Sequence, residues 1–126
     1  MRILLDSSAF VKWIYGEVVP RSVKRTIEKS RTQLLVSIVT PWEIALKAGI
    51  GKLIITNAQV ERYISEMGAQ LLPIRMEHVA HLYDLPRHHN DPFDRMLIAQ
   101  ALVERVPVVT SDERFSLYRG LQVFWD

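Results

Sequence analysis

The stretch DPFDRMLIAQALVERVPVVTSD, residues 91–112, has the most regular pattern in the chain. Its apolar residues recur three and four positions apart, which predicts an amphipathic helix over Pro92–Glu104. Asp91 followed by proline is typical of a helix N-cap and first helical position. The run PVVT at residues 107–110 is apolar and rich in β-branched residues, which predicts a buried strand. A helix that leads directly into a buried strand is a typical unit of an α/β fold.

The same alternation of apolar runs and helical segments continues through the rest of the chain. We expect short strands at residues 2–6, 34–37, 70–73, 107–110 and 122–125. We expect helices at residues 7–15, 41–48, 57–67, 76–83 and 92–104. Strands that are apolar on both faces and alternate with helices form parallel sheets covered on both sides. The predicted fold class is therefore α/β, with three α/β/α layers and a central parallel sheet of about four to five strands.

Composition narrows the class of protein. The chain has 126 residues, 48% of them hydrophobic, which suits a single domain over residues 1–126 with one real core. It has no cysteine, so disulfides and thiolate metal ligands are excluded. No apolar run approaches the roughly 18 to 20 residues that cross a bilayer, and an Asp interrupts the N-terminal apolar run too early for a signal peptide. We therefore expect a cytoplasmic protein without membrane contact.

Five acidic residues stand at the predicted ends of strands or in the first turns of helices. Asp6 ends the first strand, Glu43 begins the helix after the second strand, and Asp112 follows the PVVT strand. Asp91 and Asp94 open the long helix. Ligand sites of open α/β sheets lie beyond the carboxyl ends of the strands. These acids, far apart in the sequence, can therefore converge on one rim of the sheet.

Each acid also has a purely structural interpretation. The segment Thr40-Pro41-Trp42-Glu43 has the pattern of a capping box, and acids at 91, 94 and 112 suit helix N-termini. Asp6 fits this interpretation least well, because Asp is rare in strands and a buried carboxylate needs compensation. Asp94 stands three and four residues before Leu97 and Ile98, so its carboxylate is directed toward the rim of the sheet.

Carboxylates gathered at one rim repel one another at neutral pH, and their pKa values rise. A divalent cation removes this repulsion, and hard oxygen ligands suit Mg²⁺ or Mn²⁺. One or two such ions polarise a phosphoryl oxygen, activate water and stabilise the leaving oxygen. A carboxylate site without Cys and without evident His ligand spacing fits phosphodiester hydrolysis better than peptide hydrolysis.

Five segments of the chain follow one another in a specific order. They are LLDSSAFVKW (4–13), VSIVTPWEIALKAGIGKL (36–53), LPI (72–74), HHNDPFDRMLIAQAL (88–102) and VVTSDERF (108–115). Together they resemble the PIN-domain nucleases, and within them the VapC-like toxins of bacterial toxin–antitoxin pairs. The resemblance implies a PIN-like fold and an endoribonuclease that needs Mg²⁺ or Mn²⁺. It also implies an RNA substrate, neutralisation by a cognate antitoxin, and a homodimer.

The resemblance assigns roles to individual residues. Asp6, Glu43, Asp94 and Asp112 match the four acids of the family and are expected to bind the metal. Asp91 is an additional acid of the DPFDR variant, which we include among the catalytic residues. Ser8 matches a polar position beside the first acid and supports a ligand carboxylate or a water molecule. One metal on Asp6 and Asp94, with Glu43 orienting water, suffices for catalysis, and a second metal on Asp91 and Asp112 remains open.

Other charged and aromatic residues have two interpretations. The basic side chains of residues 20–32 lie mostly on one side of a predicted helix, as a solvated face or as a phosphate-contacting edge. His88 and His89 precede the acidic helix and are candidates for phosphate contact. Arg95 is expected to point away from its neighbour Asp94 or to pair with an acid. Lys47 follows Glu43 by four residues, a favourable helical ion-pair spacing.

Two other classes of function compete with the nuclease. A receiver domain is also an α/β fold with an acidic Mg²⁺ pocket, but it needs a Lys at a late strand end, and no Lys follows Leu53. A non-catalytic PIN-fold binding or regulatory module would be expected to lack some acids, and all of them are present. Regulation through an antitoxin that binds DNA is compatible with nuclease activity, because the DNA contact then belongs to the partner.

Overall fold

The computed structural model describes residues 1–29 and 31–125 of the chain. Ser30, which lies inside the predicted basic stretch, and Asp126, at the end of the predicted domain, fall outside the described residues. A five-stranded sheet lies at the centre, and every strand pair in it is parallel. The strand order is β3-β2-β1-β4-β5. The strands are β1 (Arg2–Leu5), β2 (Gln33–Ser37), β3 (Gln70–Leu72), β4 (Val108–Val109) and β5 (Val123–Phe124).

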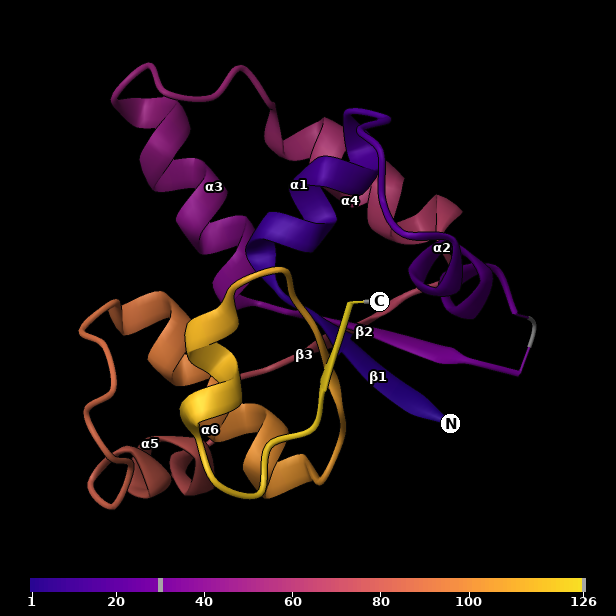
Figure 1. Ribbon diagram of the computed structural model, residues 1–126. Helices are drawn as coiled ribbons and strands as arrows, with labels where there is room; N and C mark the ends of the chain where they lie inside the picture. Colours follow the sequence, from indigo (N-terminus) through magenta and orange to yellow (C-terminus); the bar gives the residue numbers. More distant parts are fainter. Residues whose placement is uncertain (30, 126) are drawn as a thin grey trace.

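Helices cover both faces of this sheet, so the predicted three-layer α/β/α fold is confirmed (Figure 1). The helices are α1 (Ser7–Ile14), α2 (Arg21–Glu28), α3 (Val39–Gly49), α4 (Asn57–Glu66), α5 (Met76–Leu82) and α6 (Pro92–Glu104). A short 3₁₀ helix, η1 (Glu113–Leu117), connects β4 to β5. In Figure 1, α1, α2 and α4 lie on one side of the sheet, and α5 and α6 on the other.

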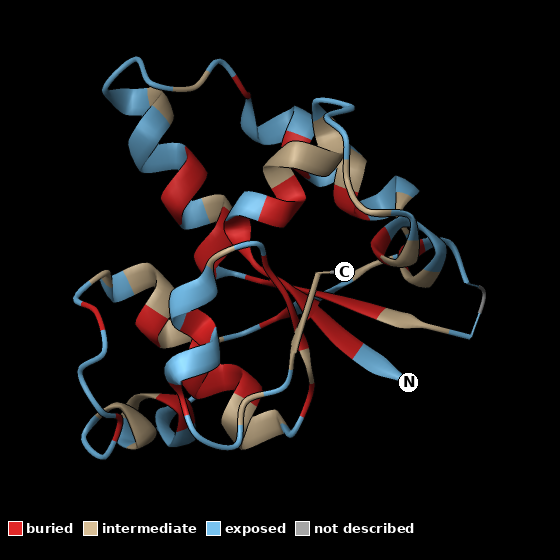
Figure 2. Cartoon of the chain, in the orientation of Figure 1, coloured by how far each residue is buried: buried red, intermediate tan, exposed pale blue. Residues whose placement is uncertain are grey.

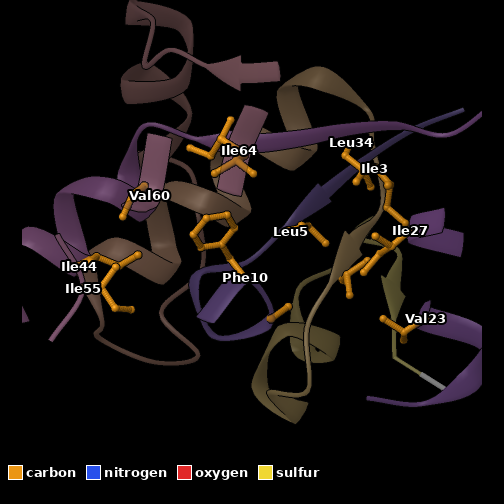
Figure 3. Packing of buried hydrophobic residues seen from close by; sticks show 13 residues of the cluster. Ile3, Leu5, Phe10, Val23, Ile27, Leu34, Ile44, Ile55, Val60 and Ile64 are labelled. Atoms are coloured by element: carbon orange, nitrogen blue, oxygen red, sulfur yellow. The ribbon is translucent and has the colours of Figure 1, made fainter. Parts of the chain in front are cut away.

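Side chains of alternate strand residues point to opposite faces of the sheet and pack into two separate hydrophobic cores. Ile3 and Leu5 of β1 pack with Phe10 of α1 and with apolar side chains of α2 and α4 (Figure 3). Leu4, between them in sequence, points to the opposite face and packs with Leu97 and other side chains of α6. Figure 2 shows the result, with buried residues along the strands and exposed residues on the outer sides of the helices. This two-sided burial explains why the strands are continuously apolar.

The strand order reverses beside β1, and in open α/β sheets such a reversal predicts a crevice at the carboxyl ends of the two adjoining strands, here β1 and β4. The chain runs from β1 outward to β2 and β3, then returns across the sheet to β4 on the other side of β1. Leu5 pairs with Val109 in the parallel register, so the loops after these two strands begin next to each other. The fold thus brings Asp6 and Asp112 to the same edge.

The start of one helix and the caps of two helices differ from the sequence prediction. The helix expected at 41–48 is α3, which begins at Val39, and Ile38 at its N-cap makes no side-chain cap. The capping box predicted for Thr40 and Glu43 is therefore wrong, because Thr40 lies inside the helix and hydrogen-bonds the Ser7 hydroxyl at 3.0 Å. The helix predicted at 57–67 is capped by Thr56, in a capping box with Gln59, and not by Asn57.

Arg105 ends α6 in the left-handed region, with φ 57° and an exposed side chain. Glycine has no Cβ to clash in this conformation, so Arg105→Gly is expected to raise the free energy of unfolding by about 0.5 to 1 kcal/mol. Urea denaturation of the variant and of wild type measures this difference. Arg119→Gly, at an exposed position without left-handed backbone, is the control and is not expected to stabilise.

No helix among the described residues is long and apolar enough to cross a membrane.

Candidate active site

A cleft of about 410 Å³ opens at the carboxyl ends of the central strands. All of the predicted acids line it: Asp6, Glu43, Asp91, Asp94 and Asp112. Ser8, the predicted supporting residue, lines it as well and is exposed. The predicted convergence of acids from separate segments therefore occurs. Whether these residues act in catalysis or metal binding stays a prediction at this point.

Asp6 lies at the bottom of the cleft, with its side chain almost fully buried. It is also the N-cap of α1, because its Oδ1 accepts a hydrogen bond from the Ala9 backbone N–H at 2.7 Å. Burial raises the pKa of Asp6 to about 6, although hydrogen bonds from Thr110 and Ala9 oppose the rise. Asp112 and Glu43 add like-charge repulsion. A lone cap would not need this degree of burial, which costs stability when the carboxylate is charged.

Asp94, in the first turn of α6, is the most perturbed acid of the cleft. Burial raises its pKa to about 7, and repulsion from Asp91, Asp6, Glu43 and Asp112 adds to the effect. Its carboxylate faces two basic groups without a close ion pair: His89 Nε2 lies 3.6 Å from its Oδ2, and Arg114 Nη2 lies 3.9 Å away. The carboxylate is thus held among like charges with little compensation from the chain.

Asp91 and Asp112 have partners of their own. Oδ1 of Asp91 caps α6 by accepting from the backbone N–H groups of Phe93 and Asp94, as the sequence predicted. Asp112 caps η1 through the Arg114 N–H, and the Arg114 guanidinium binds both of its carboxylate oxygens, with a shortest distance of 2.7 Å. This contact holds the pKa of Asp112 below its ordinary value. Both acids are therefore engaged more fully than Asp94.

Glu43 is buried on the second turn of α3, where it has one satisfied and one unsatisfied oxygen. Its Oε2 pairs with Lys47 at 3.0 Å, which confirms the predicted ion pair. Its buried Oε1 has no hydrogen-bond partner among the described residues. A buried carboxylate oxygen without a donor is costly unless a cation or water binds it. This orphaned oxygen, beside the raised pKa values of Asp6 and Asp94, fits a hard divalent cation in the cleft.

Comparison of the sequence with known protein families identifies the family of this chain. The family described as PIN domain matches residues 3–121, nearly the whole chain. The chain belongs to the PIN domain family. This membership confirms the family resemblance and leaves no place for a receiver domain. Among curated proteins, none matches the chain.

Solved structures with the same fold include several toxin–antitoxin complexes. VapBC2 from Rickettsia felis, bound to a DNA fragment from its promoter, superposes with a TM-score of 0.79 at 16% identity, covering 100% of both chains. DNA-bound VapBC from Salmonella typhimurium gives 0.68 at 16% identity, covering 98% of this chain and 97% of that one. VapBC-1 from nontypeable Haemophilus influenzae gives 0.62 at 16%, with 98% and 97% covered. At this identity the likeness concerns the fold of the PIN domain.

The cleft of this PIN domain contains charged residues that sequence reasoning missed. Lys12 and Glu17 line it, although neither was singled out. Lys12 is held at the rim by Ser111, whose Oγ accepts from its Nζ at 3.2 Å, and by the Trp125 ring, 5.1 Å away. The position of Lys12 in the segment LLDSSAFVKW, less than two helical turns after Asp6, was the available signal. Glu17 lies beyond α1, and no local pattern marks it.

The structure also decides the predictions made for His89 and Arg95, through the burial of the first and the hydrogen bonds of the second. His89 is buried against Tyr118 and Phe115, so the expectation of direct phosphate contact is wrong for it, whereas His88 is exposed. Arg95 points away from Asp94, as one of the two alternatives predicted, and donates to the carbonyls of Pro86 and Leu85. The basic residues of α2 are exposed but none lines the acidic cleft, which leaves both interpretations of that stretch open.

A second cluster, outside the cleft, has the spacing of a cation site. Within the described part of the chain, Glu77, His78 and Glu104 bring their ligand atoms within 4.8 Å of one another. His78, however, accepts the Arg75 backbone N–H at Nδ1, so its Nε2 carries the proton and donates to Glu104 at 2.9 Å. Glu104 is further paired with Arg2 and Arg75. His78 has no lone pair left for a metal, and the cluster is a neutralised contact between α5 and α6.

The raised pKa values predict how stability depends on pH without metal. Asp94 titrates near 3.8 in the unfolded chain and near 7 in the fold, so the folded state binds more protons between these values. This acid therefore lowers the free energy of unfolding as pH rises from 4 to 7. Asp94→Asn, in a chelator, is expected to become more stable than wild type by roughly 1 to 3 kcal/mol across that window.

Thermal melting at a series of pH values measures this difference. Asp84→Asn, an exposed acid that does not line the cleft, is the matched control. If the difference in stability between Asp94→Asn and wild type were the same at all pH values, the raised pKa of Asp94 would be contradicted.

Proposed function

We propose that this PIN domain is a Mg²⁺- or Mn²⁺-dependent endoribonuclease that acts as the toxin of a toxin–antitoxin pair. The observation that carries the proposal is the cleft in which acids from four parts of the chain meet, with an orphaned buried oxygen on Glu43. Structural helix caps alone do not explain why Asp6 and Asp94 are held with raised pKa values beside one another. The family membership supports hydrolysis of a nucleic acid phosphodiester.

Asp6 and Asp94 would hold the cation, with Glu43 beside them. When bound, a divalent ion supplies Lewis acidity to a phosphoryl oxygen and neutralises the charge that develops on the leaving oxygen. Glu43 lines the cleft and would orient an attacking water molecule and accept its proton, with its unpaired Oε1 as the candidate acceptor. Asp91 and Asp112 already bind backbone or Arg114 donors, which favours one cation over two.

Two lysines fit the recognition of an RNA backbone. Lys12 and Lys47 line the cleft together with the acids, and their ammonium groups would attract the phosphates that flank the scissile bond. Ser8, exposed on the first turn of α1, supports a water molecule or a carboxylate beside Asp6. The described residues contain no separate RNA-reading module, so shape and the loops around the cleft would determine which RNA is cut.

The toxin role rests on the VapBC complexes that share the fold. By analogy, a cognate antitoxin neutralises this chain, and contact with DNA is made through the antitoxin only. We also propose that residues 1–126 form one domain. The protein would act in the cytoplasm, where RNA is available. Expression of the chain in bacterial cells should arrest growth, and Asp6→Asn should relieve the arrest.

A homodimer is supported by an apolar stripe along α3 and its C-cap residue. Trp42, Leu46 and Ile50 follow one another at four-residue spacing, and each is half or more exposed, at 54%, 50% and 68%. Exposed apolar stripes of this kind are typical of protein contacts. Sedimentation equilibrium should find a dimer for wild type and a monomer for Leu46→Glu, while a Leu46→Glu protein that stays dimeric would exclude the stripe as the contact.

Cleavage of a mixed structured RNA, with EDTA, Mg²⁺ or Mn²⁺, tests the activity. We expect cleavage by wild type with either metal, none in EDTA, and none by Asp6→Asn purified in the same way. Cleavage that persists in Asp6→Asn would contradict the site. If the wild-type protein binds metal and RNA but cleaves neither total cellular RNA nor the mixed structured RNA, the result would favour a non-catalytic binding module.

A further inference from the structure

A buried histidine lies directly behind the most perturbed acid of the cleft. The side chain of His89 is 3% exposed and packs against the rings of Phe115 and Tyr118. Its Nε2 is buried, has no hydrogen-bond partner among the described residues, and lies 3.6 Å from Oδ2 of Asp94. None of the roles proposed for the cleft uses this residue.

The other nitrogen of the ring is part of a chain of hydrogen bonds that begins at Arg95. The Arg95 guanidinium donates to the carbonyls of Leu85 and Pro86 and, at 3.4 Å, to the Tyr118 hydroxyl. The Tyr118 hydroxyl lies 2.7 Å from Nδ1 of His89. All of these groups are buried or nearly so, which removes water as an alternative partner.

A guanidinium donates and never accepts, so Tyr118 accepts from Arg95. If His89 also donated from Nδ1, the buried Tyr118 hydroxyl would accept twice and its own proton would have no partner among the described residues, which is costly. The favoured direction is therefore from the Tyr118 hydroxyl to Nδ1 of His89. An imidazole that accepts at Nδ1 and is neutral carries its proton on Nε2. The fixed charge of Arg95 thus determines which nitrogen of His89 faces the cleft as a donor.

We propose that His89 is a positioning residue that presents its Nε2–H to the Asp94 carboxylate, and that the Arg95–Tyr118 pair selects this tautomer. The proposal rests on the role of Asp94 as a metal ligand. A carboxylate that binds a cation with one oxygen is oriented by a donor on the other, and partners of this kind typically change metal affinity by about 10- to 100-fold. The 3.6 Å separation is longer than a hydrogen bond, so the proposal requires the Asp94 carboxylate to approach His89 when the cation is bound.

Nitrogen NMR of the ¹⁵N-labelled full chain reads the tautomer directly, because protonated and bare ring nitrogens resonate apart. The His89 signals are identified by their loss in His89→Gln. We expect a protonated Nε2 and a bare Nδ1 in wild type, and a mixture of tautomers in Tyr118→Phe. A wild-type ring protonated at Nδ1, or at both nitrogens, would overturn the proposal.

Calorimetric titration with Mn²⁺ tests the effect on the site without any RNA. His89→Leu should weaken Mn²⁺ binding by about tenfold or more, whereas His89→Gln, whose amide N–H takes the place of Nε2–H, should recover most of it. His88→Gln, at the exposed neighbour, is the control and should bind as wild type does. Equal affinity of His89→Leu and wild type would overturn the proposal.

The failure of this proposal is distinguishable from that of the proposed function. A wild-type chain that binds no Mn²⁺ but has the Nε2–H tautomer, with a mixture of tautomers in Tyr118→Phe, would contradict the metal site and support the direction of the hydrogen bonds. A chain that binds Mn²⁺ and cleaves RNA equally well with Leu at position 89 would contradict the positioning role and leave the nuclease intact.

Discussion

Asp94→Asn is expected to lower the rate of RNA cleavage by about a thousandfold or more, while the protein stays folded. The amide removes the negative charge that a divalent cation needs, at the point where Asp6, Glu43 and Asp91 also face the cleft. The same change relieves the repulsion that raises the pKa of Asp94, so in a chelator, without metal, the variant should melt at a higher temperature than wild type. Initial rates on a labelled RNA, together with thermal melting, measure both effects.

Loss of activity with gain of stability separates a ligand from a helix cap. If Asp94 were only a favourable first-turn acid of α6, Asp94→Asn would keep full activity and lose about 0.3 to 1 kcal/mol of stability. Asp84→Asn, at an exposed position between α5 and α6, serves as the matched control for the charge change and should leave both quantities unchanged. An active Asp94→Asn would exclude this residue from the site.

Saturating Mg²⁺ or Mn²⁺ is expected to stabilise the wild-type fold strongly. At a metal concentration about 100 times the dissociation constant, linkage predicts a gain of about 2.7 kcal/mol in the free energy of unfolding. The physical reason is the cluster of acids, which repel one another until a cation is bound. Melting temperatures measured along a metal titration at constant ionic strength give this gain.

Variants that lack an acid of the cleft should lose the gain in the free energy of unfolding that metal gives wild type. In Asp94→Asn the gain should shrink to the level that Na⁺ gives at equal ionic strength. In Asp84→Asn it should match wild type. If Asp94→Asn were stabilised by Mg²⁺ as much as wild type, the cation would not depend on Asp94, and the proposed site would be contradicted.

Much of the fold could be predicted from the sequence because its signals are local. The apolar run at 2–6 and the period of α6 reflect burial on both sides of a parallel sheet and on one side of a helix. The cap of α6 by Asp91 is likewise a matter of neighbouring residues. The start of α3 could not be predicted, because Thr40 bonds Ser7, which is distant in sequence.

The acids of the candidate site could be selected because α/β topology gathers strand ends at one edge. The partners of these acids could not be predicted. Arg114 binds Asp112 through a turn whose shape no sequence pattern indicates. The contact of His89 with Tyr118 joins a residue before α6 in the sequence to one after it. The direction of the bonds around His89 depends on where the Arg95 side chain points. Such facts appear only when the chain is folded.

The most direct test of the metal site is a crystal structure of the full chain with Mn²⁺, using the anomalous signal of the ion. We predict a peak in the cleft, bound by carboxylate oxygens of Asp6 and Asp94 and near Oε1 of Glu43. A peak at Glu77, His78 and Glu104 with none in the cleft, or no peak at all at saturating Mn²⁺, would contradict the account.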